Sequence, residues 1–261
     1  MTAGTELDLL RSGELDLTGR LLAASNATFQ GTVTLDDRSA TVVYKPVAGE
    51  RPLWDFPDGT LAQREYAAYL VSEALGWSLV PPTLLRDGPF GEGMCQLWVD
   101  VDDRELVDIV PRGEVADGWL GVLEAYDGRH NPVTLVHADI PALRRMAVFD
   151  SVVNNADRKG GHILPTASGT VYGCDHGVTF NADEKLRTVL WGWAGTSLAA
   201  DEADGLRRLA GDLDGALGDE LCTLLTAAEV AITRSRVQQL LRRRRFPVPD
   251  DDRHVIPWPA L

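Results

Sequence analysis

The stretch Phe149–Phe180, FDSVVNNADRKGGHILPTASGTVYGCDHGVTF, decides the fold that this sequence predicts. Two short apolar runs, residues 163–165 and 170–174, lie on either side of a turn of small residues. Such a pair of runs predicts a β-hairpin, whose antiparallel strands bring its two outer ends together. Asp157 precedes the first run and Asp175 follows the second. The hairpin is therefore expected to bring two carboxylates close to each other.

Two cations lie beside the first carboxylate, because Arg158 and Lys159 follow Asp157 directly. Convergent carboxylates and cations are what phosphoryl transfer requires. One carboxylate orients the attacking hydroxyl, one holds Mg²⁺, and the cations neutralise the phosphates. We therefore predict Asp157 as the catalytic base or hydroxyl-orienting group, with Arg158 and Lys159 as its catalytic partners. Asp175 is the predicted metal ligand.

The order of residues 157–159 (DRK) and 175–177 (DHG) resembles the catalytic and metal-binding loops of the protein-kinase-like superfamily. Within it, the chain is similar to the atypical branch that holds the phosphatidylinositol 3-/4-kinases and the HipA-type kinases. More narrowly, it resembles an uncharacterised actinobacterial family described as phosphatidylinositol-kinase-like. This resemblance implies an α+β, two-lobed protein-kinase-like fold with a small β-rich N-lobe and a mostly helical C-lobe. It also implies ATP as phosphoryl donor, with Mg²⁺ or Mn²⁺.

The catalytic loop 154–162 departs from the superfamily at its last position. Five positions after Asp157 the superfamily usually has an asparagine that ligates Mg²⁺, and this chain has His162. Neutral imidazole prefers softer metals, whereas Mg²⁺ prefers oxygen. His162 is therefore a candidate ligand for Mn²⁺, or a hydrogen-bonding partner of phosphate. In the metal loop 175–177, Gly177 is expected to turn the chain with unusual dihedral angles.

Composition limits the possible partners. The 261 residues include 25 Lys and Arg against 39 Asp and Glu, which gives a net charge of −14. Such an acidic chain argues against nucleic acid and against an anionic membrane surface as partners. The three cysteines form no CxxC motif, and the N-terminal sequence lacks a signal-peptide pattern. The expected location is therefore the cytoplasm.

Hydrophobic periodicity and turn residues predict an N-lobe over residues 1–99 and a C-lobe over 100–261, with the acidic run at 100–103 as the boundary. The N-lobe is expected to be a β-meander with one strong helix. Its predicted elements are a helix at 4–13, strands at 19–24, 29–35 and 40–45, a helix at 61–75, and strands at 78–85 and 94–101.

In the C-lobe, a helix at 140–154 is predicted to run into the catalytic loop, with Asp139 as its N-cap. Residues 105–110 and 119–125 are compatible with helices. Further helices are predicted at 201–217 and 219–245, and three tryptophans are expected to anchor irregular segments to the body. These are Trp191, Trp193 and Trp258.

Lys45 and Glu65 are the predicted nucleotide-aligning pair. Lys45 ends a strand that reads as buried, where a lysine needs a partner. Glu65 lies 20 residues later in the predicted helix, close to the spacing between the strand lysine and the helix glutamate of kinases. The alternative is that both are solvated surface charges.

Two further segments are assigned by resemblance. The polar turn that contains Ser25, Asn26 and Thr28 resembles the Ser-rich phosphate-binding loops of phosphatidylinositol kinases, although an ordinary turn would look the same. The segment with Gln96, Trp98 and Val99 matches the position of the kinase hinge, whose backbone binds adenine. The alternative for this segment is a plain edge strand.

Two functions of different classes follow from these residues. The first is an ATP- and metal-dependent phosphotransferase whose acceptor is a protein hydroxyl, a small metabolite or a lipid, in that order of preference. The second is a pseudokinase that binds nucleotide without transferring phosphate, which His162 and the missing glycine-rich loop favour. A metal-dependent phosphate-ester hydrolase built on His162, Asp175 and His176 is a third, less favoured interpretation.

Overall fold

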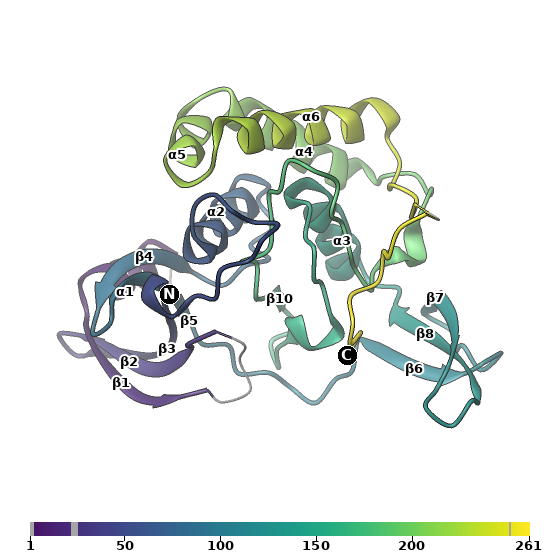
Figure 1. Cartoon of the computed structure of the whole chain (residues 1–261), viewed down its shortest axis with the longest axis horizontal. Helices are drawn as coiled ribbons and strands as arrows, with labels where there is room; N and C mark the ends of the chain where they lie inside the picture. Colours follow the sequence, from purple (N-terminus) through teal and green to yellow (C-terminus); the bar gives the residue numbers. More distant parts are fainter. Residues whose placement is uncertain (1–2, 22–25, 251) are drawn as a thin grey trace.

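The computed structural model describes residues 3–21, 26–250 and 252–261, and a five-stranded antiparallel sheet dominates its N-terminal part (Figure 1). The strand order is β1-β2-β3-β5-β4. The strands are β1 Glu14–Arg20, β2 Phe29–Leu35, β3 Arg38–Pro46, β4 Thr83–Gly88 and β5 Gly91–Leu97. Helix α1 (Ala3–Ser12) covers one face of this sheet, where Leu9 and Leu10 pack with Val33 and Val42.

Helix α2 (Leu61–Ala74) joins the sheet to the rest of the molecule. Thr60 and Gln63 form a capping box, in which each side chain accepts the backbone N–H of the other residue. The helix ends before Gly76, which adopts a φ of +69° that only glycine takes up without strain. Both ends therefore lie where the sequence predicts them. Most of α2 is buried, with contacts to β4 on one side and to α5 on the other.

The C-terminal part is mostly helical and completes the α+β architecture that the sequence predicts. Helix α3 (Pro141–Val153) is its central helix, and α4 (Ala200–Leu213), α5 (Ala216–Leu224) and α6 (Ala227–Arg243) pack around α3 and α2 (Figure 1). The hairpin β9 (Ile163–Pro165) and β10 (Val171–Gly173) follows α3, as expected. The main apolar core runs from α2 through α3 to α6 and includes Phe149 and Phe180.

A three-stranded antiparallel sheet occupies residues whose sequence is also compatible with helices. It consists of β6 (Val107–Pro111), β7 (Trp119–Tyr126) and β8 (Pro132–Ala138) in the order β6-β8-β7. The prediction of helices at 105–110 and 119–125 is wrong because these segments pair with β8, which is rich in β-branched residues. This sheet projects from one side of the C-terminal part (Figure 1).

Several other boundaries differ from the prediction. The first strand is Glu14–Arg20, which begins five residues before the predicted strand at 19–24 because the alternating residues after α1 already pair with β2. Residues 22–24 of that prediction lie outside the described residues. Strand β4 begins only at Thr83, after two prolines that have no amide hydrogen for a ladder. β5 ends at Leu97. The predicted helix 219–245 is two helices, because Thr226 caps α6 through its own capping box.

Two side-chain predictions are also wrong. Asp139 does not cap α3: the N-cap is Ile140, and the Asp139 carboxylate accepts a hydrogen bond from the Trp193 indole over 2.9 Å. Trp258 does not anchor the chain, because 90% of it is exposed. Trp193, in contrast, is buried in the core as expected.

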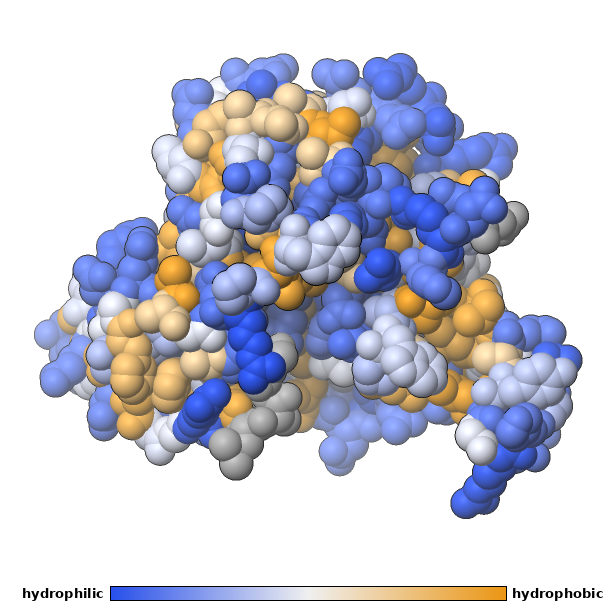
Figure 2. Space-filling model, viewed as in Figure 1, coloured by the Kyte–Doolittle hydropathy of each residue, from blue (hydrophilic) through white to orange (hydrophobic). Residues whose placement is uncertain are grey.

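The surface in Figure 2 is mainly hydrophilic, with hydrophobic residues in scattered areas. Within the described ranges, no helix is both long and apolar enough to cross a membrane.

Candidate active site

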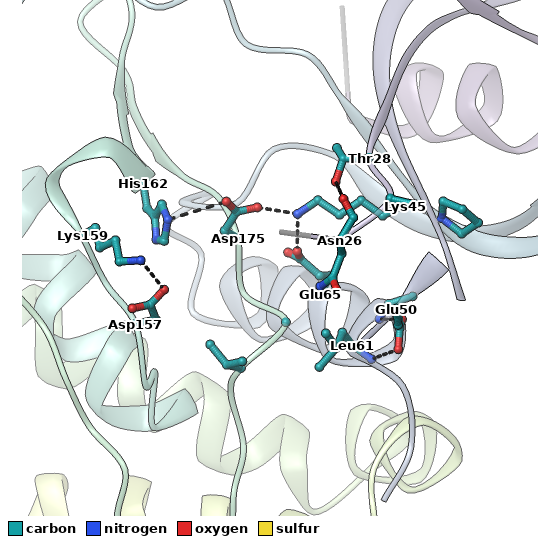
Figure 3. Close-up of a pocket in the computed structure, with 15 residues that line it drawn as sticks. Asn26, Thr28, Lys45, Glu50, Leu61, Glu65, Asp157, Lys159, His162 and Asp175 are labelled. Carbon is teal, nitrogen blue, oxygen red and sulfur yellow. Dashed lines mark hydrogen bonds and ion pairs between the residues drawn. The ribbon is translucent and has the colours of Figure 1, made fainter. Parts of the chain in front are cut away.

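Two adjoining cavities lie between the five-stranded sheet and the helical part. One, of about 410 Å³, is lined mainly by apolar side chains. The other, of about 330 Å³, is lined by most of the charged residues that the sequence singles out (Figure 3). Thr28, Lys45 and Asp175 line both, so the two cavities meet at these residues.

Lys45 lies at the junction and binds two carboxylates. Its Nζ donates to Glu65 Oε1 over 2.7 Å and also forms an ion pair with Asp175 (Figure 3). Strand β3, helix α2 and the segment after β10 each contribute one of the three groups. The predicted pairing of Lys45 with Glu65 is present in the structure, and the interpretation of both as solvated surface charges does not fit their burial.

Electrostatics keeps this cluster charged. Burial alone would lower the pKa of Lys45, but the nearby charges of Glu65 and Asp175 outweigh burial and raise it above its usual range. The Lys45 ammonium in turn holds the pKa of the Asp175 carboxyl well below its usual range. Asp175 is therefore ionised at neutral pH and available to a cation.

Glu65 also ties α2 to the metal loop. Its Oε2 accepts the backbone N–H of His176 over 2.8 Å, while Oε1 accepts from Lys45. The loop backbone is unusual at Asp175, whose φ of +59° lies in the left-handed region that aspartate tolerates better than most residues. The unusual dihedral angles expected at Gly177 are therefore found at Asp175, and Gly177 is not among the described residues with a positive φ. Glycine at 177 serves close packing, because a Cβ there would lie 3.2 Å from Leu61 Cβ.

Asp157 and Lys159 face each other in the polar cavity. Lys159 Nζ lies 3.0 Å from Asp157 Oδ2, and both side chains are partly exposed (Figure 3). The backbone N–H of Asp157 donates to Asn155 Oδ1 over 3.0 Å, which fixes the start of the loop. The structure thus brings Asp157, Lys159 and Asp175 to one cavity, as the hairpin argument predicts.

Arg158 does not lie in this cavity. Its side chain is fully buried and donates to Asp150 of α3 through Nε and Nη2, with a shortest distance of 2.9 Å. Nη1 also donates to the carbonyls of His162 and Cys174. The expected contact of Arg158 with phosphate is therefore wrong. Arg158 instead joins the catalytic loop to the metal loop from within the core, on the side away from the polar cavity.

His162 faces Asp175 across the polar cavity, with 3.6 Å between Nε2 and Oδ2. Burial lowers its pKa, so the ring is neutral at pH 7 and can act as a ligand. Its Nδ1 is buried and has no hydrogen-bond partner among the described residues. No group of three or more His, Cys, Asp or Glu side chains in the described part could hold a metal ion by itself.

These residues fit a divalent ion that is shared with a nucleotide. Mg²⁺ and Mn²⁺ in phosphoryl-transfer sites commonly take one or two protein ligands, and phosphates and water complete the shell. Asp175 supplies the carboxylate, and His162 lies beside it. An imidazole in this position suits Mn²⁺ better than Mg²⁺.

The predicted hinge residues line the apolar cavity. Trp98 and Val99 line it together with Val43 and Leu164. Gln96 also lines it, but its amide nitrogen donates to Thr83 Oγ1 over 2.8 Å, which fixes the side chain against β4. Val99 follows the end of β5, and its backbone N–H and carbonyl form no backbone hydrogen bond with the described residues, so they are available to a ligand.

The polar turn is only partly described. Asn26 and Thr28 line the polar cavity, and Asn26 Oδ1 accepts the backbone N–H of Arg51. Ser25 lies outside the described residues, so its contact with phosphate stays a prediction.

Sequence reasoning missed the structural roles of three residues that shape the site. Asp150 is the only acid in the buried part of α3, and an acid among apolar residues was the available signal. His176, which the hydrolase interpretation uses, is fully buried and lines neither cavity. It accepts from Arg158 Nη2 over 2.6 Å, while burial holds its pKa well below the usual range. Glu50 lines the polar cavity and accepts the amides of Leu61 and Ala62, but the irregular loop around it carries no signal.

Comparison with solved structures defines the class of the fold as protein-kinase-like. The structure of the Golgi casein kinase matches with a TM-score of 0.56 and 12% identity over 92% of this chain and 75% of that chain. The structure of the Golgi casein kinase with Mn/ADP bound matches with a TM-score of 0.59 and 12% identity. That match covers 99% of this chain and 80% of the kinase. At this identity the similarity establishes the fold alone.

The chain is also 52% identical over 263 residues to Protein Rv2133c of Mycobacterium tuberculosis. The aligned region covers 97% of this chain and 94% of that protein. It therefore belongs to the same family as Protein Rv2133c. No protein-family model matches the chain. The narrower resemblance to phosphatidylinositol kinases is not confirmed by these comparisons.

Proposed function

We propose that this protein is an ATP-dependent and divalent-metal-dependent phosphotransferase of the atypical kinase type. The observation that carries the proposal is the junction of an apolar and a charged cavity at Lys45 and Asp175. A nucleotide has the same division, with an apolar base at one end and a charged triphosphate at the other. The protein-kinase-like fold and the Mn/ADP in the structure of the Golgi casein kinase support it.

The apolar cavity would hold adenine between Val43 and Leu164, with the Val99 backbone as hydrogen-bonding partner at its edge. Lys45, held by Glu65, would bind the α- and β-phosphates. When bound, a divalent ion at Asp175 would neutralise the charge of the triphosphate.

The acceptor hydroxyl would meet the γ-phosphate beside Asp157. Asp157 would orient this hydroxyl and accept its proton, as general-base catalysis requires. Lys159, which lies 3.0 Å from Asp157 in the absence of substrate, would stabilise the transferring phosphoryl group. The bond from the γ-phosphorus to the β,γ-bridging oxygen breaks, ADP leaves with this oxygen, and a phosphate ester of the acceptor forms.

The proposal also includes the domain boundary and the location of the protein. We propose that the N-lobe ends at residue 99, that the C-lobe begins at residue 100, and that the protein acts in the cytoplasm.

A nucleotide-binding module without transfer activity is the second candidate. Two observations favour it: His162 replaces the usual oxygen ligand, and Asp157 is already paired with Lys159. Both candidates require nucleotide in the same cavities, and only turnover separates them.

Nucleotide binding should raise the thermal stability of the protein. A ligand that binds only the folded state stabilises it by about 2.7 kcal/mol at a concentration 100 times its Kd. We therefore expect 5 mM ATP with Mn²⁺ to raise the Tm of the wild type by several degrees, as measured by differential scanning fluorimetry. Lys45→Met should lose most of this rise. The control Lys185→Met removes an ammonium that is paired with Asp55 outside both cavities, and should keep the rise. An unchanged wild-type Tm with both Mg²⁺ and Mn²⁺ would exclude both candidates.

A further inference from the structure

The last nine residues, 253–261, run along the catalytic part of the molecule. In Figure 1 this segment descends past α3 to a terminus beside β6. Pro257 is buried, and Ile256 and Ala260 pack against the main core. We name residues 253–261 the C-terminal strap.

The strap first binds the segment that follows the metal loop. The Thr188 backbone N–H donates to the Val255 carbonyl over 3.0 Å, and the Trp191 indole donates to the same oxygen over 2.9 Å. The Arg187 guanidinium donates to the carbonyl of His254 over 3.2 Å. This segment pairs with the catalytic loop in turn, because the backbone N–H groups of Arg158 and Val189 donate to the carbonyls of Arg187 and Arg158.

The strap then contacts the catalytic loop directly. The backbone N–H of Gly160 donates to the Ala260 carbonyl over 2.8 Å. Contact at Gly160 is so close that a Cβ there would lie 2.8 Å from Leu261 Cδ2 and 3.3 Å from Val107 Cβ. Gly160 lies between Lys159 and His162, whose side chains line the polar cavity. The strap therefore holds Gly160, in the loop that carries Asp157 and Lys159, through a backbone hydrogen bond and a close contact.

We propose that the C-terminal strap positions the catalytic loop for phosphoryl transfer. The proposal rests on the proposed function, since it assigns the strap to the transfer step of that same site. Gly160 and Leu261 are positioning residues here, because neither lines the cavity that would hold the phosphates. Errors of about 1 Å in the placement of catalytic groups can cost about 10²-fold in rate. Displacing the strap should therefore lower kcat while ATP binding, which depends on Lys45 and the apolar cavity, is kept.

The test is Gly160→Val in the full chain. The exposed Leu261 side chain can turn away from a single added methyl, but the branched side chain of valine also meets Val107 Cβ and the Ala260 carbonyl, so turning Leu261 away does not make room for it. We expect kcat to fall at least tenfold while the Kd for ATP changes less than twofold. Gly160→Ala combined with Leu261→Ala is the matched small-side-chain variant: its methyl no longer meets the Leu261 side chain, and its kcat should stay within threefold of the wild type. Trp258→Ala is the matched control within the strap, because Trp258 is 90% exposed, and it should leave kcat unchanged.

Hydrogen–deuterium exchange of the peptide that covers residues 155–165 gives a readout that does not need activity. Exchange should increase in Gly160→Val and stay close to that of the wild type in the double variant. If the wild type transfers phosphate and Gly160→Val keeps both its kcat and its exchange protection, the strap proposal is wrong. If the exchange changes as expected but the wild type transfers no phosphate with any divalent metal, the proposed transferase function fails, and with it the role of the strap in transfer.

Discussion

Asp157→Asn is expected to abolish most phosphoryl transfer and to leave ATP binding close to that of the wild type. Asparagine keeps the size of the side chain and its place in the polar cavity, but it cannot accept the proton of the acceptor hydroxyl. General-base assistance contributes roughly 10²–10⁴-fold, so kcat should fall by about that factor. The measurement is transfer of radiolabelled γ-phosphate under single-turnover conditions, together with calorimetric titration of ATP in Mn²⁺.

The control for this variant is Asp183→Asn. Asp183 is exposed and lies outside both cavities, so the same chemical change there should affect neither transfer nor binding. A loss of less than tenfold in Asp157→Asn would contradict the role that we assign to Asp157. A wild type that binds ATP but transfers no phosphate would instead support the nucleotide-binding module.

Asp150→Leu should produce the largest loss of stability. Asp150 and Arg158 form a fully buried ion pair, and Asp150 also accepts from Asn155 and Thr188. Removing one partner leaves an uncompensated buried guanidinium, which typically costs about 3–5 kcal/mol. Urea unfolding followed by circular dichroism should show this decrease in the free energy of unfolding.

Two further variants make the stability test specific. Asp150→Leu combined with Arg158→Met replaces the pair with apolar side chains, and should recover much of the lost stability because no charge remains buried. Asp201→Asn breaks the exposed pair with Arg145 and should cost no more than about 1 kcal/mol. If Asp150→Leu costs as little as Asp201→Asn, the catalytic loop is not held by this pair.

Much of this fold can be predicted from local sequence patterns, namely helix caps, a glycine that ends a helix, and turn residues. Thr60 and Gly76 define the ends of α2, and a hairpin turn lies between β9 and β10 as its small residues indicate. These two elements carry Glu65 and place Asp175 after the second strand. For that reason, local sequence patterns are sufficient to predict that Asp157 and Asp175 approach each other, whereas the pairing of Lys45 with Glu65 at the same site rests on the resemblance to kinases.

Other features depend on tertiary contacts that local patterns do not reveal. Strands β6 and β7 have apolar spacing that suits a helix as well as a strand, and only pairing with β8 decides between them. In the sequence, Arg158 and Lys159 are two adjacent cations with nothing to tell them apart. In the structure, Arg158 forms a buried ion pair with Asp150, eight residues earlier, and its side chain therefore lies in the core. The contact between the strap and Gly160 joins residues 100 positions apart, which no periodicity predicts.

The most direct test of the central claim is a crystal structure of the protein with Mn²⁺ and a non-hydrolysable ATP analogue. We predict adenine in the apolar cavity between Val43 and Leu164, phosphates within hydrogen-bonding distance of Lys45, and Mn²⁺ bound to Asp175 and to phosphate oxygens. A nucleotide bound outside these two cavities, or one whose phosphates lie away from Lys45 and Asp175, would contradict the proposed function.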